Sequence, residues 1–180
     1  MTRSILTIAA AALLLAGCTS KEPGDPTAGA TTSTTATKSP DKTTTTSKPA
    51  SGDALADFDA CAQVNAVASQ LSLSRIEPSG KDECDARWGQ TTTAVKVKAF
   101  PDLGISDATG GSKARISDTS IGTRKAKKVE AGVTDTSCLI AVEVGSKSRV
   151  DFYAASTTSV QESCDAATKL ATAIEPKLPK

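Results

Sequence analysis

Five cysteines are the residues of this 180-residue chain whose type and spacing most clearly imply chemistry. One lies near the N-terminus, and four are spread over the rest of the chain: Cys18, Cys61, Cys84, Cys138 and Cys164. In an exported chain, an even number of cysteines predicts disulfides, because oxidising compartments convert paired thiols into cross-links. No pair of the four has the two-residue spacing of a zinc knuckle, so two disulfides are favoured over a zinc site.

Four cysteines allow three pairings, and we favour the one that joins near neighbours. It links Cys61 to Cys84 and Cys138 to Cys164. Each bond closes a loop of about 25 residues, for which the chain-entropy model gives roughly 3 kcal/mol of stabilisation. Such cross-links matter in a chain with only 3% aromatic residues.

The absence of histidine narrows the chemistry that the chain can perform. It excludes Ser-His-Asp and Cys-His catalysis and every His-ligated metal site. The formal net charge of +1 gives no general attraction to nucleic acid. We find no catalytic constellation, metal site or cofactor motif, so the sequence predicts a protein that is not an enzyme and has no nucleic-acid partner.

The N-terminus has the layout of a bacterial lipoprotein signal peptide. Arg3 supplies a positive charge, residues 5–15 are apolar, and Leu15-Ala16-Gly17-Cys18 resembles a lipobox. The apolar stretch is shorter than the ~20 residues that cross a bilayer, which disfavours a transmembrane helix. We therefore predict a signal peptide over 1–17 and a fatty-acylated Cys18 that anchors the protein on the outer face of the cell membrane. The alternative is an ordinary signal peptide with Cys18 close to the cleavage site.

Residues 18–52 form a linker that is mostly Thr, Ser, Pro, Ala and Gly. It lacks the large apolar residues needed to offset the entropy of ordering, so it is predicted to be disordered. Thr/Ser-rich stretches with Pro resemble O-glycosylated stalks, and a bare spacer is the equal alternative.

Residues 53–180 are expected to form one domain, with 16 basic and 17 acidic side chains. Helical apolar spacing follows Cys61, and Ser159 with Glu162 fits a capping box before a second helix, which Pro176 should end. Alternating apolar residues predict strands at 84–88, 92–100, 124–130, 138–144 and 150–154. We expect residues 76–80 to end the first helix and 104–112 to form a loop. The order predicts an α+β fold in which an N-terminal and a C-terminal helix pack on one face of an antiparallel sheet of about 4–6 strands.

Two clusters and one single residue are candidate sites, and each could instead have a purely structural role. The basic residues Lys96, Lys98, Arg124, Lys125, Lys127 and Lys128 could form a patch for anionic lipids or wall polymers. A solvated strand face that opposes aggregation is the favoured explanation. Residues 82–85 contain three acids but no EF-hand spacing, so solvated carboxylates are favoured over calcium binding. Trp88 is expected to pack in the core rather than to bind a ligand.

Taken together, the lipobox, the Thr/Ser/Pro spacer and the Cys84-x-x-x-Trp88 strand resemble the actinobacterial secreted lipoproteins that carry a four-cysteine domain of unknown function. Cys61 in the first helix, Cys138 in a Val-rich strand and Cys164 in the last helix extend the resemblance over residues 57–178. It implies a disulfide-bonded envelope domain and assigns no catalytic residue.

These features predict a monomeric, membrane-anchored binding or interaction module of the cell envelope. Its partner could be an envelope protein, a wall polymer or a lipid. One alternative is a carrier of a small apolar ligand, which an enclosed cavity between helices and sheet would favour. A less favoured alternative is a His-free hydrolase, which needs titratable groups converging in a concave site.

Overall fold

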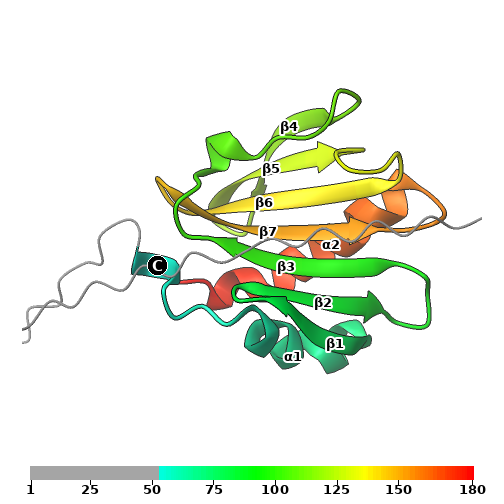
Figure 1. Cartoon of the computed structure of the whole chain (residues 1–180), viewed down its shortest axis with the longest axis horizontal. Coiled ribbons are helices and arrows are strands. Elements are labelled where there is room, and N and C mark those ends of the chain that lie inside the picture. The colour runs from blue at the N-terminus through cyan, green and yellow to red at the C-terminus, as the bar shows by residue number, and fades with distance from the viewer. Residues whose placement is uncertain (1–52) are drawn as a thin grey trace, which may run out of the picture. The chain divides into compact units, whose positions relative to one another are not determined.

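The structure is a computed structural model that describes residues 53–180. The predicted signal peptide (1–17), the linker (18–52) and the acylated Cys18 lie outside the described residues. Besides three short 3-10 helices, the described part contains two α-helices and seven strands (Figure 1): α1 (Ala60–Leu71), β1 (Leu73–Gly80), β2 (Glu83–Trp88), β3 (Ala94–Phe100), β4 (Arg115–Ile121), β5 (Arg124–Glu130), β6 (Ser137–Gly145), β7 (Ser148–Ala155) and α2 (Val160–Ile174).

All seven strands belong to one antiparallel sheet with the order β1-β2-β3-β7-β6-β5-β4. The predicted α+β class is therefore confirmed, and the strand count is above the predicted range because of the two edge strands. The first helix ends at Leu71, before the predicted 76–80, and β1 occupies that segment. Its register against β2 shifts twice, and Pro78 lies inside it, so the regular alternation that announces a strand is absent. β4 is exposed along most of its length and carries little apolar signal.

Both helices begin at capped residues. The Asp59 side chain accepts a hydrogen bond from the Ala62 amide (2.9 Å), and Ser159 accepts one from the Glu162 amide (3.2 Å). The second half of the predicted capping box is wrong. The Glu162 carboxylate accepts from the Thr93 hydroxyl instead (2.6 Å), because β3 begins beside the start of α2. α2 ends at Ile174, directly before the turn that contains Pro176, as predicted.

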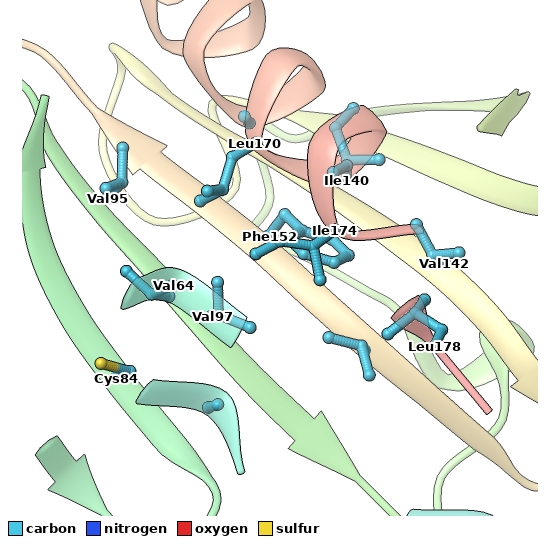
Figure 2. Packing of buried hydrophobic residues seen from close by; sticks show 14 of the residues in the cluster. Val64, Cys84, Val95, Val97, Ile140, Val142, Phe152, Leu170, Ile174 and Leu178 are labelled. Atoms are coloured by element: carbon cyan, nitrogen blue, oxygen red, sulfur yellow. The ribbon is translucent and has the colours of Figure 1, made fainter. Parts of the chain in front are cut away.

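The helices cover one face of the sheet, which we call the covered face. α1 packs on β1, β2 and β3, while α2 packs on β6 and β7. Alternate residues of each central strand point into this interface, so that Val97, Phe152 and Val142 are completely buried. Val64 from α1 and Leu170 and Ile174 from α2 join the same cluster (Figure 2). The interior between helices and sheet is filled by apolar side chains.

Both predicted disulfides are present and lie on the covered face. Cys61–Cys84 joins α1 to β2, and Cys138–Cys164 joins β6 to α2. Each helix is therefore bonded covalently to a strand beneath it. Trp88 packs against the core cluster, as expected.

The opposite side of the sheet, which we call the open face, is covered by neither α1 nor α2. The connection from β3 to β4 (residues 101–114) starts at a central strand and ends at an edge strand, so it crosses the strands between them. It contacts the open face at two points. The Gly104 carbonyl accepts from Arg149 on β7 (2.9 Å), and Gly110 lies against Val129 on β5. The connection thus shields one part of the open face and leaves uncovered the part over β1, β2 and β3, together with the neighbouring parts of β7 and β6.

Candidate functional site

The uncovered part of the open face contains three adjoining hollows, which together we call the open-face groove. The largest has a volume of about 470 Å³ and is lined mainly by side chains of β1, β2, β3 and β7: Arg75, Glu77, Asp85, Arg87, Ala94, Lys96 and Tyr153, with Ala86 and Val95. A second hollow of about 310 Å³ shares Arg75 and Arg87 with the first. A third of about 330 Å³ shares Lys96 and Tyr153 with the first. The hollows therefore adjoin one another across the sheet, with Arg75 and Arg87 between the first two and Lys96 and Tyr153 between the first and the third.

The end of the groove formed by the second hollow is cationic. Arg75 and Arg87 are its charged residues, and Ser74, Gln90, Thr91 and Thr92 supply uncharged polar groups. One Arg87 nitrogen donates to the Thr92 carbonyl (3.0 Å), which holds this guanidinium at the edge of the hollow. No carboxylate lines this hollow, and neither arginine forms an ion pair with the described residues. The exposed guanidinium groups can therefore bind an anion.

Arg75 is placed by a β-bulge. Ser74 pairs with Arg87 and Glu77 with Asp85, so two residues of β1 oppose a single residue of β2. Arg75 has a φ of 51°, in the left-handed region that costs a non-glycine residue of the order of 1 kcal/mol. Bulges commonly redirect a side chain beside a functional site. Here the bulge places Arg75 in both adjoining hollows.

The middle of the groove contains ion pairs. Glu83 on β2 bonds to Lys96 and to Lys98 (2.8 Å), and Lys96 also lies 3.4 Å from Asp85. The hydrogen bond from Lys96, together with the one from Lys98, lowers the pKa of Glu83 from 4.5 to about 2. The same contact with Glu83 raises the pKa of Lys96. The two lysines therefore share two carboxylates, and the charges of these four side chains cancel.

The far end of the groove is largely apolar. Phe100, Val133, Leu139 and Tyr153 line the third hollow together with Lys96, Lys98 and Asp151. Val133 is 77% exposed, the most exposed large apolar side chain of the described region. The Lys98 ammonium lies 5.2 Å from the centre of the Phe100 ring, in the range of a cation–π contact. A hollow of this composition suits an uncharged, apolar group.

A buried ion pair separates the groove from the part shielded by residues 101–114. Arg149 donates to both oxygens of Asp151 (2.8 and 3.3 Å) and stacks over Phe100 at 4.4 Å. Both charged residues are nearly inaccessible to solvent. Burial raises the pKa of the Asp151 carboxyl, while Arg149 and Lys98 act in the opposite direction. The pair is a structural clamp that fixes the connection through Gly104.

The predicted basic patch is not one surface, because side chains alternate between the two faces of a strand. Arg124 lies on the covered face, where it bonds to Glu175 (3.3 Å), and Lys128 on the same face bonds to Glu130 (2.9 Å). Lys125 and Lys127 lie on the open face of β5. They are three strands, or about 14 Å, away from β3, which carries Lys96 and Lys98. The prediction of one patch with all six residues was therefore wrong.

Residues 82–85, the other candidate cluster, do not form a site of several free carboxylates. Cys84 is in a disulfide on the covered face, whereas Glu83 and Asp85 bond to lysines on the open face. Within residues 53–180, no group of three or more Cys, Asp or Glu side chains could hold a metal ion. The same part of the chain has no helix that is long and apolar enough to cross a membrane.

Sequence reasoning did not find Arg75, Arg87 or Tyr153 as site residues. They come from β1, β2 and β7, and only the strand order brings them to one groove. Isolated arginines and a single tyrosine carry no spacing signal that could have found them.

Comparisons of the chain with protein-family models, with curated proteins and with solved structures find no match. The likeness to actinobacterial lipoproteins therefore stays a prediction from the residues that carry it.

Proposed function

We propose that the protein is a lipid-anchored binding module on the outer face of the cell membrane, and that the open-face groove is its binding surface. The anchor and the location follow from the apolar segment and the lipobox that ends at Cys18. The linker then gives the domain reach away from the membrane. The observation that carries the binding role is the contrast between a filled helix–sheet interior and the three adjoining hollows on the open face.

A binding role is better supported than a catalytic one. Hydrolysis by a pair of carboxylates requires one that carries a proton and one that does not. In the groove, Asp85 is bonded to Lys96, and the strong pKa shift is the downward shift of Glu83. Asp151, whose pKa is raised, is buried and held by two hydrogen bonds from Arg149. Glu83, Asp85 and Asp151 are thus each held by a cation, which leaves Glu77 as the one carboxylate lining the groove that has no ion pair with the described residues.

The apolar third hollow favours the carrier function as a second candidate. A carrier with this fold would hold its ligand in the groove, since apolar side chains already fill the space between helices and sheet. Both candidates therefore use the same surface.

The anchor is tested by the Cys18→Ser variant. We expect wild-type protein to incorporate labelled fatty acid and to sediment with membranes, and the variant to incorporate none. Equal labelling of the variant would disprove the anchor. Protease added to intact spheroplasts should degrade the domain if it faces outward, and complete protection would disprove the location.

The binding surface is tested by photo-crosslinking in the producing cells. A benzoylphenylalanine replaces Tyr153 in the groove, and a matched control replaces Gln161, which is exposed on α2. We expect adducts with an envelope component from position 153 and not from position 161. Equal adducts from both positions, or none from 153, would disprove the proposed surface.

A further inference from the structure

We propose that the open-face groove binds a fatty acid, with its carboxylate at Arg75 and Arg87 and its chain along Tyr153 towards Leu139 and Val133. This inference rests on the proposed function, because it names the class of ligand for the same groove. It follows from the order of side chains along the adjoining hollows, with two unpaired arginines at one end, ion-paired lysines in the middle and mainly apolar side chains at the other end.

The head-group position follows from the two arginines. They lie on adjacent strands beside the paired residues Ser74 and Arg87, and both line the first and the second hollow. A carboxylate has two oxygens and can accept from both guanidinium groups at once, in the strong charge-assisted geometry that arginine favours. Gln90 makes no hydrogen bond with the described residues, so its amide is also free to donate.

The charge of the ligand is limited by what lies beyond the arginines. Lys96 is already bonded to Glu83 and Asp85, so it offers little to a second anionic group. Glu77 also lines the first hollow, and it forms no ion pair with the described residues. A second negative charge on the ligand would be repelled there. The groove therefore suits a ligand with one negative charge at its end.

The tail position follows from the third hollow. From β2, the path crosses β3 and β7 to reach β6, a distance of about 14 Å at the usual strand spacing. Ala94 and Tyr153 flank the first part of this path, and Leu139 and Val133 the last. An unbranched alkyl chain can lie along these side chains and cover the exposed Val133.

The backbone conformation of Arg75 allows its role in stability to be tested separately from its role in binding. Glycine would adopt its φ of 51° without a steric penalty, yet the chain holds an arginine there. We therefore expect Arg75→Gly to keep or raise the melting temperature while it weakens ligand binding. A residue with only a structural role would not separate these two effects.

The test is calorimetric titration of the full mature chain with Cys18→Ser, so that the protein's own acyl groups do not compete. Decanoate, below its micellar concentration, should bind with a 1:1 stoichiometry. Decyltrimethylammonium should bind at least about tenfold more weakly, since it has a similar tail and the opposite charge. Arg75→Gly and Arg87→Gln should each weaken decanoate binding by about tenfold, the loss expected of a charge-assisted hydrogen bond.

Lys125→Gln is the matched control. Lys125 is an exposed cation on the same face but outside the groove, and it forms no ion pair with the described residues. Its loss should change the affinity by less than about twofold. Tyr153→Ala should weaken decanoate several-fold and leave the weak binding of acetate unchanged.

Three results would overturn the inference: no binding of decanoate, equal binding of the cationic amphiphile, or an equal loss with Lys125→Gln. The crosslinking experiment separates this failure from a failure of the proposed function. If decanoate does not bind but position 153 still crosslinks to an envelope component, the ligand class is wrong and the surface is right. If both experiments fail, the groove is not a binding site.

Discussion

The two faces of the sheet are built from the same strands but differ in the side chains they carry. On β7, Val150, Phe152 and Ala154 point to the covered face and are completely buried among apolar groups. Their neighbours Arg149, Asp151 and Tyr153 point to the open face. The covered face carries the apolar core and both disulfides, whereas the open face carries ion pairs and the groove. Stability is therefore concentrated on one side of the sheet, which leaves the other side free to bind.

The largest expected effect tests this division at adjacent residues. Phe152→Ala removes a fully buried ring and should lower the free energy of unfolding by about 4 kcal/mol. Tyr153→Ala, on the other face of the same strand, removes a half-buried ring and should cost about 1 kcal/mol or less. Urea unfolding of both variants measures the difference. Equal losses would show that the open face is as important for stability as the covered face.

The disulfides should give the next largest effect. The Cys138→Ala/Cys164→Ala variant opens a loop with a sequence separation of 26, which corresponds to roughly 3 kcal/mol on the chain-entropy model. The Cys61→Ala/Cys84→Ala variant, with a separation of 23, should lose a similar amount. Unfolding by urea without reductant tests both. If either variant is as stable as the wild type, the covered face does not depend on its cross-links.

Much of the covered face could be predicted from sequence. Its strands alternate regularly, as Val95 and Val97 do against Lys96 and Lys98, and its helices have local caps at Asp59 and Ser159. The disulfide pairing was predicted from sequence proximity alone. Each of these signals is carried by residues close together in the chain, so no knowledge of the fold is needed to see it.

The open face could not be predicted in the same way. The groove depends on the position of β7 between β3 and β6, which places Tyr153 beside Lys96. It also depends on the bulge at Arg75 in β1. The register of this strand is irregular, so its sequence lacks the alternating pattern from which a strand can be predicted. The prediction of one basic patch was wrong for a related reason, because adjacent residues of a strand, such as Arg124 and Lys125, lie on opposite faces of the sheet. Long-range register determines this surface, and a single sequence does not encode it in any local pattern.

The third largest effect is expected from the buried ion pair Arg149–Asp151, which tests how much the open face contributes to stability. Arg149→Met leaves the Asp151 carboxyl buried without its partner and should cost about 2–3 kcal/mol near neutral pH. Burial has already raised the folded-state pKa of Asp151, and loss of Arg149 should raise it further. A group with a raised folded pKa stabilises the protein below its unfolded pKa and loses that contribution as the pH rises through the folded value. The penalty should therefore shrink on acidification, which urea unfolding across a pH series measures.

The double variant Arg149→Met/Asp151→Leu is the control for this pair. Replacing both charges by apolar groups removes the need to bury either, so most of the lost stability should return. The recovered free energy would identify the pair as a clamp for the 101–114 connection that adds little net stability. If the double variant is less stable than Arg149→Met, the ion pair itself stabilises the open face, and the contrast between the faces is weaker than proposed.

The smallest expected effect has the opposite pH dependence. The pKa of Glu83 is lowered to about 2 by its hydrogen bonds with Lys96 and Lys98, so its stabilisation is fully present above about pH 4.5 and is lost as the pH falls towards 2. Because the two lysines are partly exposed and screened by solvent, we expect Glu83→Gln to cost only about 1 kcal/mol near pH 7. The difference from wild type should vanish near pH 2 and shrink at about 1 M salt. A difference that is independent of both pH and salt would mean that Glu83 acts through packing, and that charge does not hold the middle of the groove together.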